Sequence, residues 1–140
     1  MIQRKQTLWL LLSVIAAVLT FKFPFFNGTV INGTKGVQGA ELTATDNIFL
    51  MLLTSAIIII ALVTIFMYKN RKLQIQLTFL GLFLSVGLIA LYYYYTKNFE
   101  PGGRISLTAL LSLLTLSGFF MGLRGIRKDQ KLIKDLNRLR

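Results

Sequence analysis

Four long apolar stretches, separated by short polar segments, dominate the pattern of hydrophobic and polar positions along the chain. They cover about residues 7–26, 48–68, 75–95 and 105–123. A helix needs ~20 mostly apolar residues to cross the hydrocarbon core of a bilayer, and each stretch has about that length. The pattern therefore predicts an all-α membrane protein, with a four-transmembrane-helix bundle over residues 1–123 and a basic amphipathic helix over residues 124–140.

The distribution of Lys and Arg around these stretches predicts the orientation of the bundle. Twelve of the 16 lie on the face formed by residues 1–6, the link at 69–72 and the tail, and four lie on the other face. Positively charged loops stay in the cytoplasm, so we expect both termini there. Arg4 and Lys5 before an apolar run resemble the start of a signal peptide, but no A-x-A site follows. We expect an uncleaved first span in a bacterial inner-membrane protein.

Aromatic side chains mark the expected membrane interfaces. Trp9 lies near the inner end of the first stretch, and the third stretch closes at the outer surface with Tyr92, Tyr93, Tyr94 and Tyr95. Aromatic belts of this kind are typical of both membrane surfaces. Consecutive tyrosines point around a helix rather than onto one face. We therefore interpret them as an interfacial belt and not as a stacking platform for a ligand.

The outer loop over residues 27–47 is the largest segment expected outside the bilayer. The triplet Asn-Gly-Thr occurs in it twice, beginning at Asn27 and at Asn32. Asn-Gly favours hairpin turns and Thr-Val-Ile favours strands, so we expect a short β-hairpin. Both triplets match the Asn-x-Thr glycosylation pattern, which we interpret as accidental in a bacterial protein. Asp46, just before the second stretch, is expected to cap that helix.

Small residues inside the apolar stretches indicate close helix packing. Gly118 and Gly122 are four residues apart in the fourth stretch, as are Gly81 and Ser85 in the third. This spacing lets helix backbones approach closely, either within the bundle or against another membrane protein. No ionisable residue lies at the expected midplane, where ion-coupled transporters and proton pumps carry them. We therefore do not expect a transporter.

The tail combines an apolar stripe with a dense positive charge. Leu132, Leu136 and Leu139 fall on one helical face, and the basic residues on the rest of the helix are Arg127, Lys128, Lys131, Lys134, Arg138 and Arg140. Such a helix suits anionic lipids of the inner leaflet, an acidic protein partner, or ribosomal RNA beside a translocation channel. No nucleic-acid motif supports the RNA alternative, so nucleic acid is the least favoured of the three.

Composition supports a membrane location and removes many kinds of chemistry. The chain is 54% hydrophobic with a mean hydropathy of +0.64, and its net charge is +11. It contains no Cys and no His, which excludes disulfides, thiolate nucleophiles, Cys/His zinc sites and His-ligated haem. We expect no catalytic residue, no cofactor and no metal site.

The start of the chain carries a resemblance to a known family. The chain begins Met1-Ile2-Gln3-Arg4, continues through Gln6-Thr7-Leu8 into a Leu-rich span, and ends in a basic tail. This start and layout resemble a family of uncharacterised small membrane proteins of the Bacteroidota, whose members start with Met-Ile-Gln-Arg and have four spans. The layout similarity covers the whole chain. It implies an inner-membrane protein of unassigned function and supplies no site residue.

These observations favour a non-catalytic accessory or scaffold subunit of a larger inner-membrane complex, with its basic tail on the inner leaflet or on a cytoplasmic partner such as the translocon or ribosome. A second hypothesis is a four-helix membrane protein that binds a lipid or quinone. A third is an enzyme at the outer surface, which would require Glu41, Asp46, Glu100 and Arg104 to converge.

Overall fold

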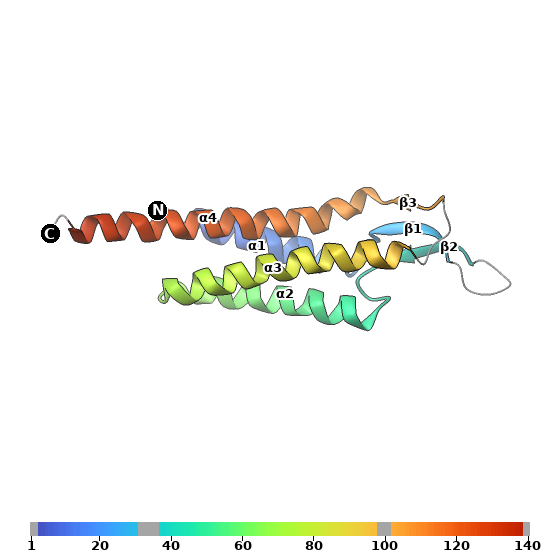
Figure 1. The fold of residues 1–140 in the computed structure, drawn as a ribbon, viewed down its shortest axis with the longest axis horizontal. Coiled ribbons are helices and arrows are strands. Elements are labelled where there is room, and N and C mark those ends of the chain that lie inside the picture. Colours follow the sequence, from blue (N-terminus) through green and yellow to red (C-terminus); the bar gives the residue numbers. More distant parts are fainter. Residues whose placement is uncertain (1–2, 31–36, 98–101, 139–140) are drawn as a thin grey trace.

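The computed structural model describes residues 3–30, 37–97 and 102–138 (Figure 1). This part of the chain is predominantly helical, as the hydropathy pattern predicted, and also holds a small sheet. Its elements in chain order are α1 (Gln3–Leu19), β1 (Phe26–Val30), β2 (Val37–Leu42), α2 (Ile48–Phe66), α3 (Arg71–Thr96), β3 (Arg104–Ile105), the 3-10 turn η1 (Leu107–Ala109) and α4 (Leu110–Arg138).

The four α-helices run up and down beside one another and form a closed ring. Contacts join α1 to α2, α2 to α3, α3 to α4, and α4 back to α1. The three strands cover one end of the bundle, which we call the sheet end, while the start of α1 and the last turns of α4 lie at the opposite tail end (Figure 1). Segments far apart in sequence, α1 and α4, are therefore neighbours.

Three of the four helices are long and apolar enough to cross a membrane. They are the helical segments Ile48–Phe66, Arg71–Thr96 and Leu107–Leu136. The apolar part of α1, Lys5–Leu19, is shorter. The expectation of a first span that continues to Phe26 is wrong, because α1 ends at Leu19 and Phe26 begins β1.

Pro24 explains why the helix does not continue to Phe26. The backbone tightens after Leu19, where the amide of Lys22 donates to the Leu19 carbonyl at 3.1 Å. Pro24 has no amide hydrogen, and its ring disfavours the helical conformation of the residue before it. The chain therefore leaves the helix and enters the sheet. The fourth span is also shorter at its start than expected, since Arg104 and Ile105 form β3 and the α-helix begins at Leu110.

The expected hairpin is present, and a third strand joins it. β1 and β2 pair antiparallel with Phe26 opposite Leu42, and β3 pairs with the other edge of β1, with Arg104 opposite Asn27. The strand order is therefore β2-β1-β3. Asn27 lies within β1 and not at its turn. The second Asn-Gly-Thr triplet falls within residues 31–36, outside the described residues.

Buried positions repeat along the helices at alternating spacings of four and three. In α2 they are Leu50, Thr54, Ile57, Ala61 and Thr64. In α3 they are Gln74, Thr78, Gly81, Ser85, Leu88 and Tyr92. An average of 3.5 residues keeps one seam of each helix against its neighbours, as in coiled coils and most four-helix bundles.

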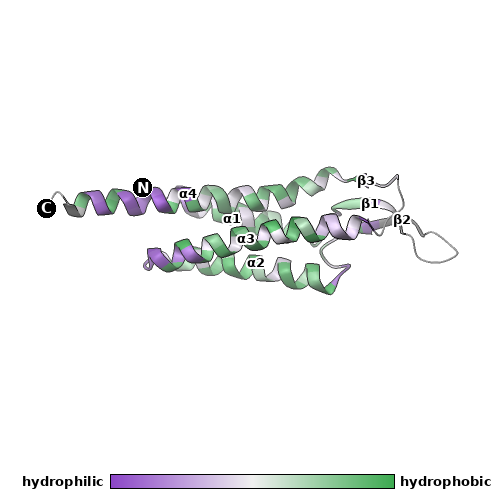
Figure 2. Cartoon of the chain, in the orientation of Figure 1, coloured by the Kyte–Doolittle hydropathy of each residue, from purple (hydrophilic) through white to green (hydrophobic). Residues whose placement is uncertain are grey.

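The distribution of polar and apolar side chains is the reverse of that in a water-soluble bundle, with the large apolar side chains outside. Many of the buried residues are small or carry hydroxyls, including Ser13, Thr54, Thr64, Thr78, Ser85 and Thr115. Large apolar side chains face outward along all four helices, among them Leu8, Ile15, Leu52, Ile59, Phe66, Phe83 and Phe120. Figure 2 shows hydrophobic residues along the helices and hydrophilic residues toward the ends of the bundle. Exposing such a surface to water is unfavourable, whereas lipid accommodates it.

The buried hydroxyls bond to helix carbonyls and leave little free polarity in the interior. Thr54 donates to the Leu50 carbonyl at 2.7 Å and Thr78 donates to the Gln74 carbonyl at 2.6 Å. Ser85 likewise donates to the Leu82 carbonyl at 2.8 Å. A hydroxyl that bonds to its own helix behaves as a small, satisfied side chain. The interior hydroxyls thus permit close packing and do not form a polar path.

Glycines bring α1 and α4 into the closest contact of the bundle. A Cβ at Gly118 would lie 2.1 Å from Ser13 Oγ and 2.7 Å from the Trp9 carbonyl oxygen, and one at Gly122 would lie 3.1 Å from Leu10. Ser13 also crosses the seam to donate to the Thr115 carbonyl at 3.0 Å.

Gly81 plays the same part between α3 and α4. A Cβ there would lie 2.3 Å from the ring of Phe119, a side chain with no solvent exposure. The two seams together hold α4 against both of its neighbours.

We predict that Gly118→Ala destabilises the bundle. The new methyl meets a backbone carbonyl that cannot rotate away, so α1 and α4 must separate, and overpacking of this kind costs ~1–3 kcal/mol. Gly87→Ala is the matched control, since nothing lies within 4 Å of a Cβ at Gly87. Unfolding of the purified chain in detergent, followed by circular dichroism, should show a lower midpoint for Gly118→Ala only. Equal midpoints for the two variants would contradict the assignment.

Candidate functional site

Polar and charged side chains from three helices gather around a cavity of about 20 Å³ at the tail end of the bundle. The residues that line it are Gln6, Thr7, Tyr68, Arg71, Gln74, Ile126 and Asp129. Asp129 is buried although it lies in a strongly basic segment. A volume of this size holds about one water molecule, so the cavity is a polar contact between helices and not a pocket for an organic ligand.

The side chain of Gln6 on α1 contacts Asp129 on α4. Gln6 Nε2 donates a hydrogen bond to Asp129 Oδ2. This approach depends on Gly125, because a Cβ there would lie 2.7 Å from Gln6 Cγ. Gly125 therefore lies inside a continuous helix and serves a close contact, rather than acting as a hinge between the fourth span and the tail.

Arg71 brings the opposite charge to the same cavity from the start of α3. Among the described residues, Arg71 Nη1 and Asp129 Oδ1 are buried and have no hydrogen-bond partner. A buried charge is costly, and a nearby opposite charge lowers that cost. Gln74, one turn further along α3, donates from Nε2 to the Thr64 carbonyl of α2 at 3.3 Å. The cluster thus links all four helices at one level.

This polar cluster was not predicted from the sequence, although a signal for it exists. Leu123, Ile126 and Asp129 follow one another at spacings of three on the buried face of α4. A carboxylate that falls on the same helix face as buried apolar residues indicates a buried partner. The partner is Gln6, a buried polar residue of α1.

The basic tail continues α4 past the end of the bundle. In Figures 1 and 2 the helix runs on without a break, and its hydrophilic last turns extend beyond the other helices. Arg127, Lys131 and Lys134 line a groove of about 480 Å³ with Gln130 and Ile133. Leu132 and Leu136 are 42% and 67% exposed, so the described part of the apolar stripe is uncovered; Leu139 lies outside the described residues. The side chain of Arg138 and residue Arg140 lie outside what the structure describes.

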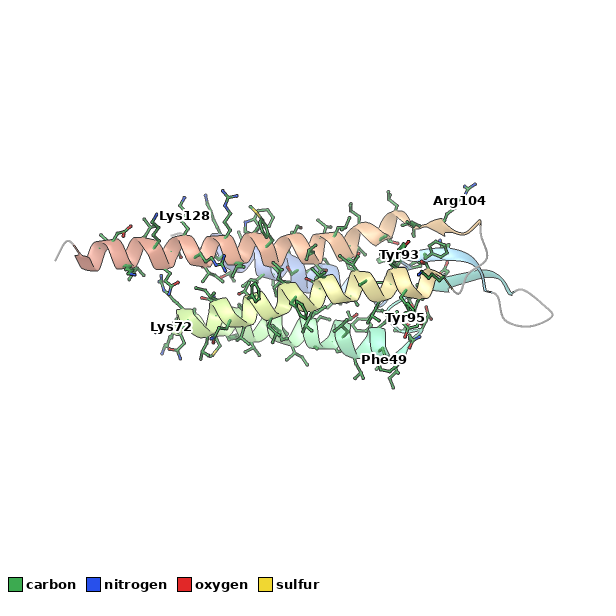
Figure 3. All side chains as sticks on the ribbon, viewed as in Figure 1. Phe49, Lys72, Tyr93, Tyr95, Arg104 and Lys128 are labelled. Atoms are coloured by element: carbon green, nitrogen blue, oxygen red, sulfur yellow. The ribbon has the colours of Figure 1, made fainter. Side chains whose placement is uncertain are left out.

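The tyrosines at the sheet end divide into two groups. Tyr93 and Tyr94 are exposed, and Tyr95 is partly buried. Figure 3 shows Tyr93 and Tyr95 at the sheet end, with Lys72 and Lys128 toward the tail end. Tyr92 does not belong to a surface belt, because it is 1% exposed and its ring stacks on Phe25 with centroids 4.5 Å apart. Its position on the buried seam of α3 places it inside the bundle.

The acidic residues of the outer loop do not form one site in the described part of the chain. Asp46 does not cap α2; its Oδ2 accepts from the hydroxyl of Thr43 at 2.9 Å and from the Thr43 amide. The N-cap of α2 is Asn47, whose side chain makes no capping bond. Glu41 and Arg104 both lie opposite Asn27 in the sheet, on either side of β1, and Glu100 is outside the described residues.

Comparison with known sequence families assigns the chain to a family. The family described as Domain of unknown function (DUF4293) matches residues 2–139. No curated protein and no solved structure matches the chain.

We predict that Asp129→Leu destabilises the tail end of the bundle. It removes the acceptor of Gln6 and the carboxylate that shares a cavity with Arg71, and an unsatisfied buried polar group costs ~1–3 kcal/mol. Asp129→Asn should cost less, because its amide oxygen can still accept from Gln6. Asp135→Asn, at an exposed position of the same helix, should change stability by no more than about 0.5 kcal/mol. Detergent unfolding measures all three, and a neutral Asp129→Leu would contradict the assigned contacts.

Proposed function

Given that the chain belongs to the family described as Domain of unknown function (DUF4293), we propose from its physical features that it is an integral protein of a bacterial inner membrane. We propose further that it acts as a non-catalytic accessory subunit, whose basic tail docks on an acidic partner protein in the cytoplasm.

The dimensions and surface of the bundle support membrane insertion. The 19 residues of α2 measure ~28 Å at 1.5 Å per residue, close to the ~30 Å of a bilayer core. The exterior at this depth is apolar, and the residues where the helices contact one another are small. This arrangement allows helices to pack closely in lipid. α1 is shorter, and the strands at the sheet end would lie at the adjoining membrane surface.

Charge supports a cytoplasmic tail end. The start of α1, the link between α2 and α3 and the second half of α4 lie toward that end (Figure 1). These segments carry Lys5, Lys69, Lys72, Arg124 and Lys128. Positively charged segments of this kind remain on the cytoplasmic side. The sheet end, with far fewer basic residues, would face the periplasm.

The observation that carries the accessory role is the direction of the tail. Residues 130–138 continue α4 for ~14 Å past the level of Asp129 without a bend (Figure 1). A helix that lies on a leaflet runs parallel to the membrane surface, whereas this one continues along the axis of the bundle. A tail that projects into the cytoplasm is suited to a protein partner.

The chemistry of the tail defines the partner surface. Among its described residues the exposed apolar ones are Leu132, Ile133 and Leu136, and basic residues flank them. An amphipathic helix of this kind binds in an apolar groove, and the flanking cations select a groove bordered by carboxylates. The tight contacts at Gly81 and Gly118 speak against the alternative of a lipid or quinone held between the helices, because those seams leave no room for one.

Topology can be tested with single cysteines, since the natural chain has none. We expect Thr45→Cys, exposed at the sheet end, to react with an impermeant maleimide in intact cells. Asn70→Cys, exposed in the link between α2 and α3, should react only after permeabilisation. The reverse pattern would overturn the orientation, and labelling of both positions in intact cells would contradict a sealed, membrane-spanning bundle.

Docking of the tail can be tested by site-specific photo-crosslinking in the native membrane. A photoreactive amino acid at Leu136 should yield one protein adduct of defined mass. The same group at Leu113, an outward-facing position within the span, should react with lipid. Adducts to lipid alone at Leu136 would show that the tail lies on the leaflet and would overturn the proposed docking.

A further inference from the structure

A second, larger depression lies between α1 and α4 near the tail end. It has a volume of about 530 Å³ and is lined by Lys5, Gln6, Trp9, Met121, Arg124, Gly125 and Lys128. Gly125 on α4 and Gln6 on α1 meet there, since a Cβ at Gly125 would lie 2.7 Å from Gln6 Cγ. We call this depression the α1–α4 groove. It shares no lining residue with the groove along the tail, and it shares only Gln6 with the small cavity around Asp129.

The charged side chains that line the α1–α4 groove are all positive. Lys5 comes from α1, and Arg124 and Lys128 come from α4 one turn apart. All three side chains are exposed, and the described residues that line the groove include no carboxylate. The Asp129 carboxylate is turned away, into the contact with Gln6 on the buried side of α4. Three cations from two helices therefore surround a space without an anion of the chain's own.

Apart from Gln6 and Gly125, the rest of the lining consists of Trp9 and Met121, which adjoin the apolar exterior of the bundle. Trp9 is 38% exposed, and Met121 lies one turn before Gly125 on α4. Leu8 and Phe120, next to these two residues in sequence, are exposed apolar side chains. A ligand with an anionic head between the cations could therefore extend an apolar chain along the outside of the bundle.

We propose that the α1–α4 groove binds one anionic glycerophospholipid of the inner leaflet. Arg124 donates to the phosphate in the fork geometry that guanidinium groups favour, and Lys5 and Lys128 supply further charge. Trp9 and Met121 contact the glycerol backbone and the start of an acyl chain. The site rests on the membrane placement proposed above and is independent of the tail partner.

Depth and shape favour a lipid over a soluble anion. The groove lies at the level where the basic residues change to the apolar exterior, which is where headgroups meet acyl chains. Basic pockets between membrane helices on this side are suited to anionic headgroups. A soluble phosphate would use the cations and leave the apolar half of the groove in contact with lipid chains.

Trp9 provides a direct reporter, because it is the single tryptophan of the chain. The purified full-length chain is reconstituted in phosphatidylcholine vesicles that contain increasing fractions of dibrominated phosphatidylglycerol or dibrominated phosphatidylcholine. Bromine quenches tryptophan at contact. We expect half-maximal quenching at an anionic lipid fraction at least about fivefold lower than the zwitterionic fraction, from charge contacts of the usual strength. Equal fractions would overturn the proposal.

Two matched pairs of substitutions separate a defined site from general attraction. Arg124→Gln with Lys128→Gln removes two cations of the groove and should abolish the preference. Arg127→Gln with Lys131→Gln removes the same residue types at the same spacing from the groove along the tail, and should preserve it. If both pairs lost the preference for the anionic lipid equally, the preference would come from general charge attraction, and the proposed site would be wrong.

A variant on the other helix tests whether the site spans the seam. Lys5→Gln should lower the preference severalfold, and Lys72→Gln, an exposed cation of α3, should not. If 10 mM inorganic phosphate relieved the quenching by the anionic lipid, the groove would be a site for soluble anions and the lipid assignment would be wrong.

The same experiment distinguishes failure of the lipid site from failure of membrane insertion. If the bundle does not insert, brominated phosphatidylcholine at high fraction leaves Trp9 unquenched. If it inserts without a specific lipid site, both brominated lipids quench equally. Circular dichroism of each variant shows whether the helices are retained.

Discussion

The contact between α1 and α4 is the interaction on which the rest of the structure depends. It joins the first and last helices and so closes the ring of four. Gly118, Gly122 and Gly125 remove side chains from α4 where Trp9, Leu10 and Gln6 approach it. Dispersion contacts between closely packed backbones contribute much of the association of helices in lipid, where no hydrophobic effect acts between them. The glycine positions therefore set the distance between the two helices and their relative height.

That relative height determines the chemistry of the tail end. It places Gln6 beside Asp129 and brings both to the cavity that Arg71 reaches from α3. The same seam leaves the α1–α4 groove on its outer side, where the cations of two helices meet Trp9. Beyond this level none of the other described helices accompanies α4, so the described part of its apolar stripe stays uncovered. One packing contact thus produces an internal polar link, an external basic groove and a free helical arm.

Many interior side chains carry hydroxyl groups, but these hydroxyls are already bonded to helix carbonyls. Ser and Thr at the buried positions satisfy their hydroxyls on carbonyls three or four residues earlier, as Thr64 does at Ile60 with a distance of 2.6 Å. Their small size allows close approach, and their donors are already occupied. At the sheet end, the stacked rings of Phe25 and Tyr92 and the bond from the Ser106 amide to the Phe25 carbonyl attach the strands to the bundle.

The sequence by itself predicted the four apolar helical segments, the bounds of α2 and α3 to within a few residues, and the pairing of two strands before α2, because apolar length and β-branched residues act locally. It also indicated the closely packed glycines. Only the tertiary structure decided which helix each glycine contacts, that Tyr92 turns inward while Tyr93 stays exposed, and that Arg104 adds a third strand to β1. It alone placed Asp129 beside Gln6, 123 residues away. The local pattern of the sequence determines which face of its own helix a residue occupies. Which residue it contacts depends on how all four helices align, and that alignment cannot be derived from any one segment of the chain.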